Sequence, residues 1–128
     1  MALNQDMYDY LVTISDLTDL VSVNSIFWND FPEGVVTSVT YKMISNPRKY
    51  NAGSVDDTWQ RWRFYINHAS KVTCKAIADV LTQNLHEMGG DIGGTIVSYI
   101  AQIDESDPNI REDLALYEII QDYSINKH

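Results

Sequence analysis

The chain holds few side chains of the kinds that commonly do chemistry: three histidines and one cysteine, Cys74. His68 could act as a general base if an acid lay beside it, but it directly follows a predicted strand, where a histidine is more often a polar corner residue. His86 falls near the end of a predicted helix, where a cation suits the helix dipole. Cys74 lies on an apolar helix stripe, whereas a nucleophilic cysteine needs exposure and a lowered pKa. We therefore predict no catalytic residue.

The residue spacing indicates no metal or cofactor site. The histidines lack a short ligand spacing, and one cysteine cannot build a zinc site. The acidic segment 104–107 lacks the glycine that a calcium loop carries at its sixth position. Two glycine pairs, Gly89-Gly90 and Gly93-Gly94, lead from a predicted helix into a strand, whereas a phosphate site requires the reverse order. We expect the glycine segment to be a flexible turn and predict no cofactor.

One face of a predicted strand carries the side chains best suited to binding another molecule: Trp59, Arg61, Arg63 and Tyr65. Aromatic side chains interleaved with arginines could hold single-stranded nucleic acid, but the same residue types are enriched in protein interfaces. The net charge of −9 argues against a binder that works by neutralising phosphates. We therefore predict that this face is a protein interface.

The segment before this strand adds a second candidate contact. Residues 45–57 show no periodicity and contain both a proline and a glycine, so we predict a long loop between two paired strands. Loops of this length in a compact domain are often functional. This one carries Arg48, Lys49 and Tyr50, which we include in the candidate interface.

The charges are divided unevenly along the chain. Seven of the nine bases lie between Lys42 and Lys75 against two acids, a net of +5, which leaves −14 for the remainder. One interpretation is a dipolar surface that orients the molecule against copies of itself or a partner. The other is that the blocks mix in space and the dipole cancels.

A strand and a helix must position these residues. In the strand 58–67, Trp62, Phe64 and Ile66 alternate with the polar side, which predicts that they face a core. Ser70 can cap a helix that extends to Leu85. That helix carries an apolar stripe at spacings of three and four, made of Cys74, Ile77, Ala78, Leu81 and Leu85.

The remaining segments complete one domain, 1–128. We predict a helix, a short extended piece and three further strands, over residues 4–15, 26–28, 35–44, 95–104 and 114–125, with an acidic loop at 104–113. The expected fold is α+β, an antiparallel sheet of about four main strands with helices packed on one face. Several strands are apolar on both sides, so a loop or another subunit should cover the second face.

Composition limits the setting in which the chain works. It contains no run of about 18 apolar residues, so no membrane-spanning helix is expected. The N-terminus lacks the basic and apolar regions of a secretory signal. A single cysteine cannot form an internal disulfide, which favours a cytosolic origin.

Taken together, these segments resemble the tail-terminator and tail-completion (tail-to-head joining) proteins of long-tailed bacteriophages. The resemblance covers essentially the whole chain as a pattern, and its motifs transfer no active site. They are Met1-Ala2-Leu3 with a helix through Tyr10, the segments 26–28 and 31–34, Val39-Thr40-Tyr41, the strand 61–66, the helix segment 76–81, and the closing segment 116–123.

The resemblance implies a structural, non-enzymatic virion assembly protein. Such proteins assemble as rings, typically hexamers, which cap the tail tube and join it to the head connector. The expected partners are further copies of the chain, the tail tube protein and the head-connector protein. DNA would pass through the lumen without specific binding, and no membrane is involved. The protein would reside in the virion, at the tail or head-tail junction, and in the host cytoplasm during assembly.

Two questions stay open at the level of sequence. The resemblance does not separate a tail terminator from a joining protein on the head side. The residues also leave a different class possible, a small-molecule-binding or hydrolytic α+β domain that uses His68 and nearby acids.

Overall fold

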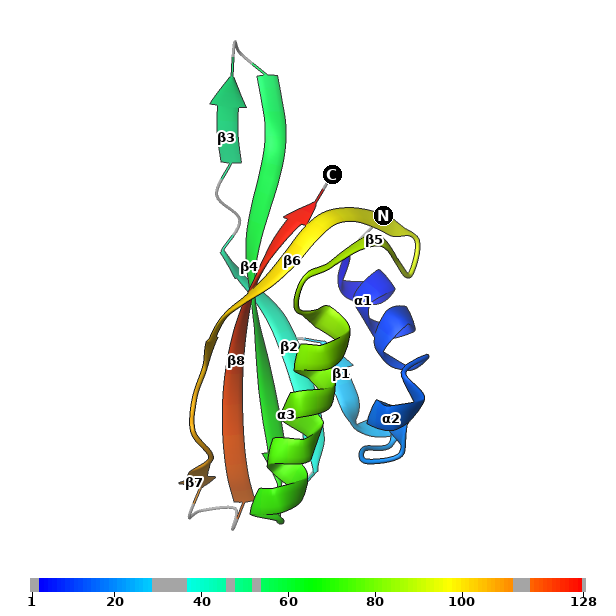
Figure 1. Ribbon diagram of the computed structural model, residues 1–128, viewed down its shortest axis with the longest axis vertical. Coiled ribbons are helices and arrows are strands. Elements are labelled where there is room, and N and C mark those ends of the chain that lie inside the picture. Colours follow the sequence, from blue (N-terminus) through cyan, green and yellow to red (C-terminus); the bar gives the residue numbers. More distant parts are fainter. Residues whose placement is uncertain (1–2, 29–36, 46–47, 52–53, 112–115, 128) are drawn as a thin grey trace.

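The computed structural model describes residues 3–28, 37–45, 48–51, 54–111 and 116–127 (Figure 1). Its helices are α1 (Leu3–Leu11), α2 (Ser15–Thr18), the 3-10 turn η1 (Val23–Ser25) and α3 (Lys71–Leu85). Its strands are β1 (Ile26–Trp28), β2 (Ser38–Ser45), β3 (Arg48–Asn51), β4 (Ser54–His68), β5 (Met88–Ile92), β6 (Thr95–Glu105), β7 (Asn109–Arg111) and β8 (Leu116–Lys127). None of the helices in these ranges is both long and apolar enough to cross a membrane.

All eight of these strands belong to one sheet, in the order β1-β2-β4-β8-β6-β5. In addition, β3 pairs with the first part of β4, and β7 pairs with the first part of β8. The sheet is mixed, because β1 runs parallel to β2 whereas the other pairs are antiparallel. The longest continuous register joins β4 and β8, from Thr58↔Lys127 to His68↔Tyr117.

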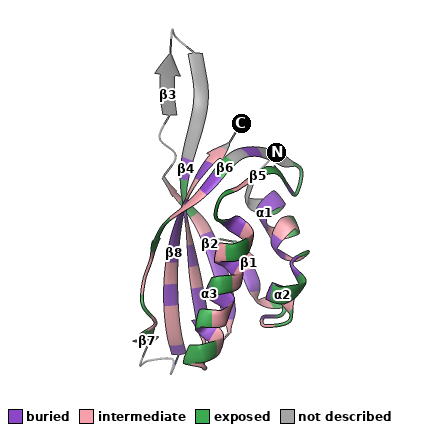
Figure 2. Ribbon diagram, viewed as in Figure 1, coloured by how far each residue is buried: buried purple, intermediate pink, exposed green. Residues whose placement is uncertain are grey.

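Breaks in register accompany a curl of the sheet into a half-barrel. The β2–β4 pairing shifts between Met43 and Ser45, and the β6–β8 pairing shifts twice. Such bulges bend a strand and increase its twist. The two end strands of the order, β1 and β5, both contact α1, while α3 contacts β4, β8 and β6. Helix α3 therefore lies along one side of the sheet, here called the inner face, with α1 beside it (Figures 1 and 2).

The core lies between α3 and the inner face. The predicted alternation of β4 is confirmed, because Trp62, Phe64 and Ile66 are all buried. The Phe64 ring stacks on Tyr41 at a centroid distance of 5.5 Å and meets Tyr123 edge-on at 5.3 Å. Such aromatic pairs add stability beyond the area that they bury.

The predicted helix at 70–85 is also confirmed. The Ser70 side-chain oxygen accepts a hydrogen bond from the Thr73 N–H at 3.3 Å, which caps α3. The predicted stripe is buried in full, and its members are Cys74, Ile77, Ala78, Leu81 and Leu85.

The predicted fold class is wrong. We expected an antiparallel sheet of about four main strands with helices packed on one face, but the described sheet is mixed, has eight strands and curls into a half-barrel. Three of the additional strands, β3, β5 and β7, fall in segments that we predicted to be loops or turns. Short strands at the margin of a sheet need little apolar alternation, so their sequences resemble loops.

The long loop predicted at 45–57 is wrong in the same way. Arg48–Asn51 forms β3, and β4 begins at Ser54, so this segment contributes a hairpin that extends beyond the rest of the sheet (Figure 1). The acidic loop at 104–113 likewise contains β7. The predicted helix 4–15 is shorter, because α1 ends at Leu11 and α2 begins at Ser15. Residues 35–36 of the predicted strand 35–44 lie outside the described ranges.

The glycine segment is a strand and a tight turn rather than a flexible connection. Met88–Ile92 forms β5, and Gly93 and Gly94 have positive φ angles of 61° and 113°. A Cβ at Gly93 would collide with the backbone carbonyl of Asp6, so this turn and α1 can approach only because residue 93 is glycine.

Replacing Phe64 with alanine should lower the free energy of unfolding by about 3–5 kcal/mol, because the change removes a buried ring and leaves a cavity. Urea denaturation of the wild type and the variant measures this difference. Tyr99→Ala is the matched control, an aromatic-to-alanine change at an exposed position of β6, with an expected loss of about 1 kcal/mol or less. A loss below about 1 kcal/mol for Phe64→Ala would contradict its place in the core.

Candidate functional site

The candidate interface lies on the outer face of the sheet, the face turned away from α3. Along β4, Arg61, Arg63 and Tyr65 alternate with the buried core residues and are exposed or half-buried. The side chains of Arg61 and Arg63 keep 45% and 33% of their surface exposed. The structure therefore brings these three predicted residues together on one face.

The other four predicted residues are only partly described. Arg48, Lys49 and Tyr50 belong to β3, and Trp59 belongs to β4. Their side chains lie outside the part of the chain that the structure describes, so their membership of the interface stays a prediction.

A buried carboxylate organises the described part of this face. Asp122, on β8, lies directly opposite Arg63 in the β4–β8 register, and 4% of its side chain is exposed. The Arg63 Nε and Nη2 atoms donate to its two oxygens at 2.7 and 3.0 Å, and Arg61 Nη2 donates to Asp122 Oδ2 at 2.7 Å. Two-pronged arginine–carboxylate contacts are among the stronger hydrogen bonds in proteins. Asp122 therefore fixes both arginines in place.

The protonation of Asp122 follows from these contacts. The hydrogen bond from Arg63 lowers the pKa of the Asp122 carboxyl, burial opposes that effect, and Arg61 reinforces it, so the net shift is downward. The same hydrogen bond raises the pKa of the Arg63 guanidinium. Both partners are therefore charged at neutral pH, and two positive groups surround one negative group.

A third cation lies on this face beside Tyr65. The Lys42 ammonium, on β2, lies 5.4 Å from the centroid of the Tyr65 ring. A cation at this distance from an aromatic face is attracted by the ring. Lys42 also stands opposite Arg63 in the β2–β4 register. The described centre of the outer face is thus basic and aromatic.

One end of the same face carries polar side chains that are buried. Ser38 stands opposite Asn67 in the β2–β4 register, with Thr40 two residues further along β2. Among the described contacts, the Ser38 and Thr40 hydroxyls and the Asn67 amide have no hydrogen-bond partner. This end therefore differs from the centre of the face, where Asp122 pairs with both arginines.

The three residues considered for catalysis each have a place in the described fold. His68 Nδ1 accepts a hydrogen bond from the Ser70 N–H at 2.9 Å, which holds the corner between β4 and α3. His86 Nδ1 accepts from the Gln102 N–H at 3.0 Å. Cys74 is fully buried, and burial raises the pKa of its thiol to about 11. Among the described residues, no three histidine, cysteine or acidic side chains are grouped as metal ligands would be.

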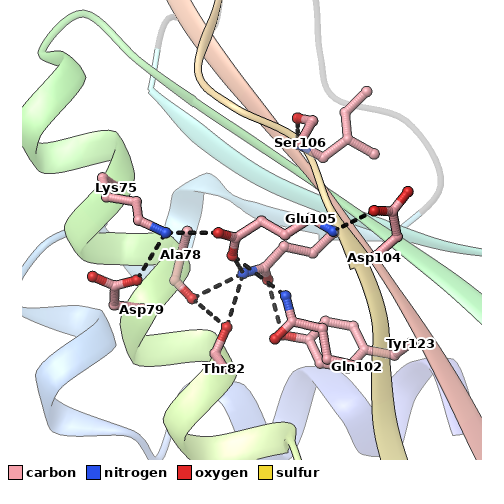
Figure 3. A network of polar contacts seen from close by, with 11 residues as sticks. Lys75, Ala78, Asp79, Thr82, Gln102, Asp104, Glu105, Ser106 and Tyr123 are labelled. Carbon is pink, nitrogen blue, oxygen red and sulfur yellow. Dashed lines mark hydrogen bonds and ion pairs between the residues drawn. The ribbon is translucent and has the colours of Figure 1, made fainter.

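A polar network inside the domain joins α3 to the sheet (Figure 3). The Gln121 amide, fully buried on β8, donates to Glu105 Oε1 at 2.6 Å and to the Ala78 carbonyl at 2.9 Å. Lys75 Nζ donates to Glu105 Oε2 at 2.6 Å, and the Tyr123 hydroxyl donates to Gln121 Oε1 at 2.9 Å. Burial alone would raise the pKa of Glu105, but the contacts with Lys75 and Gln121 outweigh it and lower the pKa. The network fixes how α3 sits on β6 and β8.

Sequence reasoning missed the two acids that hold this arrangement, Asp122 and Glu105. Each lies far along the chain from its basic partner: Asp122 follows Arg63 by 59 positions, and Glu105 follows Lys75 by 30 positions. An acid on a strand that carries apolar residues on both faces was the available signal for Asp122, since buried charges are normally paired.

Comparison with known proteins shows that the fold of this chain is similar to that of solved structures. No protein-family model matches the chain, and no curated protein matches it. A chain in the solved structure described as "Virion of native gene transfer agent (GTA) particle" is 14% identical, with a TM-score of 0.76, over 98% of this chain and 94% of that chain. A second solved structure, described without a function, is 10% identical, with a TM-score of 0.55, over 99% of both chains. The similarity spans the whole domain, and at these identities it concerns the fold alone.

The Asp122 contacts predict how stability depends on pH. Because the pKa of Asp122 is lower in the folded than in the unfolded chain, its contribution is present above about pH 4 and is lost as the pH falls through the folded value. Asp122→Asn should cost about 1.5–3 kcal/mol at neutral pH, the range for hydrogen bonds to charged groups. The cost should shrink in strong acid, where the wild-type carboxyl is itself protonated.

Urea denaturation of both proteins at neutral and at strongly acid pH measures this difference. Asp107→Asn is the matched control, because Asp107 is exposed and enters no ion pair between described residues. An Asp122→Asn cost that is the same at both pH values would show that the carboxylate charge is not what stabilises the fold.

Proposed function

We propose that this chain is a structural virion assembly protein of the tail-completion class. On this proposal, copies of the chain form a ring, six in number as the resemblance implies, that caps the tail tube and joins it to the head connector. The observation that carries the proposal is the similarity of fold, over nearly the full length of both chains, to a chain of a gene transfer agent virion. The tail-like sequence pattern supports the finer role.

The described positions of the two histidines and the cysteine considered for catalysis support a non-enzymatic role. His68 and His86 each use Nδ1 to hold a backbone N–H, and the Cys74 thiol is buried with a raised pKa. A nucleophilic cysteine has the opposite properties. Because these three side chains contribute to folding, we assign the function to the protein's surfaces, where it can contact neighbouring proteins.

The outer face is the surface that we assign to a neighbouring virion protein. Arginine and tyrosine are common anchors at protein interfaces, and Asp122 holds Arg61 and Arg63 in fixed positions. Side chains that are already ordered lose less entropy on binding. The net charge of −9 also suits a ring around DNA, because an acidic lumen does not hold phosphates.

Deletion of the gene for this chain, followed by examination of the particles that are produced, tests the proposed role directly. Electron microscopy of the lysate should then show separate heads and tails, or tails of irregular length, and supplying the wild-type chain should restore joined particles. Joined, infectious particles in the absence of the chain would contradict the proposal.

A single substitution tests the outer face. Arg61→Gln leaves the two-pronged contact between Arg63 and Asp122 in place, so the free energy of unfolding should change by less than about 1 kcal/mol. If this face binds a neighbour, the yield of joined particles should fall several-fold in a complementation assay. Gln83→Glu, at an exposed position of α3, makes the same change in net charge and should leave the yield unchanged. Equal yields from both variants would remove Arg61 from the interface.

A further inference from the structure

A groove runs along the solvent-exposed side of α3. It has a volume of about 550 Å³ and is lined by Lys71, Val72, Lys75, Ala76, Asp79 and Pro108. Val72 is 80% exposed, although it is a β-branched apolar residue in a helix. Ile110, two residues beyond Pro108 on β7, is exposed as well. Contiguous exposed apolar surface on a domain is a common feature of protein interaction sites.

Another apolar patch lies on the opposite flank of the molecule. Trp28, at the end of β1, is 48% exposed, and Met43 on β2 is 43% exposed. Trp28 stands opposite Tyr41, and Met43 follows Tyr41 by two residues, so both side chains point to the same face. Tryptophan is one of the residue types enriched among the anchors of protein interfaces. The pair Trp28 and Met43 is called the Trp28 patch below.

Charge distinguishes these two surfaces. Asp9 is exposed on α1, and α1 contacts β1, the strand that ends at Trp28, so an acidic helix lies beside the Trp28 patch. Residues 1–41 contain no lysine or arginine. At the groove, Lys75 is held by Glu105 and Asp79, whereas exposed Lys71 enters no ion pair between described residues. Lys71 also lies in the first turn of α3, where the helix dipole adds positive potential.

We propose that the groove on α3 binds the Trp28 patch of a second copy of this chain. The apolar walls of Val72, Ala76 and Pro108 receive the tryptophan, while Lys71 of one copy faces Asp9 of the next. The inference rests on the proposed function, because a ring requires contacts between two different patches of neighbouring copies.

The position of the two surfaces gives the contact its geometry. β1 is one end of the sheet order, whereas β7 pairs with β8 on the side away from β4. Figure 1 shows β1 and β7 on opposite sides of α3. A contact between two different patches is head-to-tail, and such contacts close into rings when the rotation between copies allows it. A second copy therefore leaves one groove and one Trp28 patch available for further copies.

Self-association of the purified full chain, measured by sedimentation over a range of concentrations, tests the contact. Val72→Lys should weaken association by at least about tenfold, because it places a charge in an apolar groove. Val72 is largely exposed, so the variant should unfold like the wild type. Gln83→Lys is the matched control, since it adds the same charge about 16 Å further along the same helix. It should associate like the wild type.

A charge exchange identifies the partner surface. Lys71→Glu and Asp9→Lys should each weaken association several-fold, and the double variant should recover most of the loss, because the pair is restored with reversed signs. Wild-type protein that stays monomeric, unimpaired Val72→Lys, or a double variant no better than the single ones would each overturn the inference.

The same variants separate this inference from the proposed function. If Val72→Lys forms rings and joins particles normally, the groove is not the contact, and the role in joining stands. If it loses self-association but particles still join, the contact stands, and the proposed role of the ring fails.

Discussion

The register between β4 and β8 is the constraint on which the rest of the structure depends. These strands pair without interruption from Thr58↔Lys127 to His68↔Tyr117. That pairing directs Phe64 and Tyr123 toward α3, and it places Arg63 opposite Asp122 on the outer face. Because side chains alternate along a strand, a shift by one residue would exchange the two faces. The core and the basic outer face therefore depend on one register.

The strand β4 and the helix α3 were predicted well from local sequence patterns, because these patterns do not depend on contacts with distant segments. The alternation at 58–67 and the stripe at 70–85 each repeat within a few residues, and both are found as expected. The architecture was not predictable in the same way. The parallel pairing of β1 with β2 and the bulges that accompany the curl are set by contacts between separate segments. The strands β3, β5 and β7 are short and rich in polar or glycine residues, so their pairing partners define them.

The candidate site shows the same division between local and distant information. The alternation of arginines with apolar residues indicated that Arg61 and Arg63 share a face, but not that Asp122 binds both. The charge distribution had two interpretations, a dipolar surface or charged blocks that mix in space. These ion pairs agree with the second, because bases of the middle segment meet acids from the C-terminal part of the chain. Lys75 and Glu105 repeat the arrangement on the inner side. The excess negative charge on α1 and α2, at Asp9, Asp16 and Asp19, has no such partner among the described ion pairs.

The paired charges of the outer face and the exposed apolar residues of the flanks would contribute differently to assembly. A partner that covers Arg61 and Arg63 must remove water from charges that are already paired, which gives little net affinity but constrains orientation. Burial of Trp28 or Val72 removes apolar surface from water and carries no such cost. In the proposed ring, affinity would come from the flanks and orientation from the outer face. Trp28 and Val72 lie outside the β4–β8 pairing, so these flanks can change without altering that register.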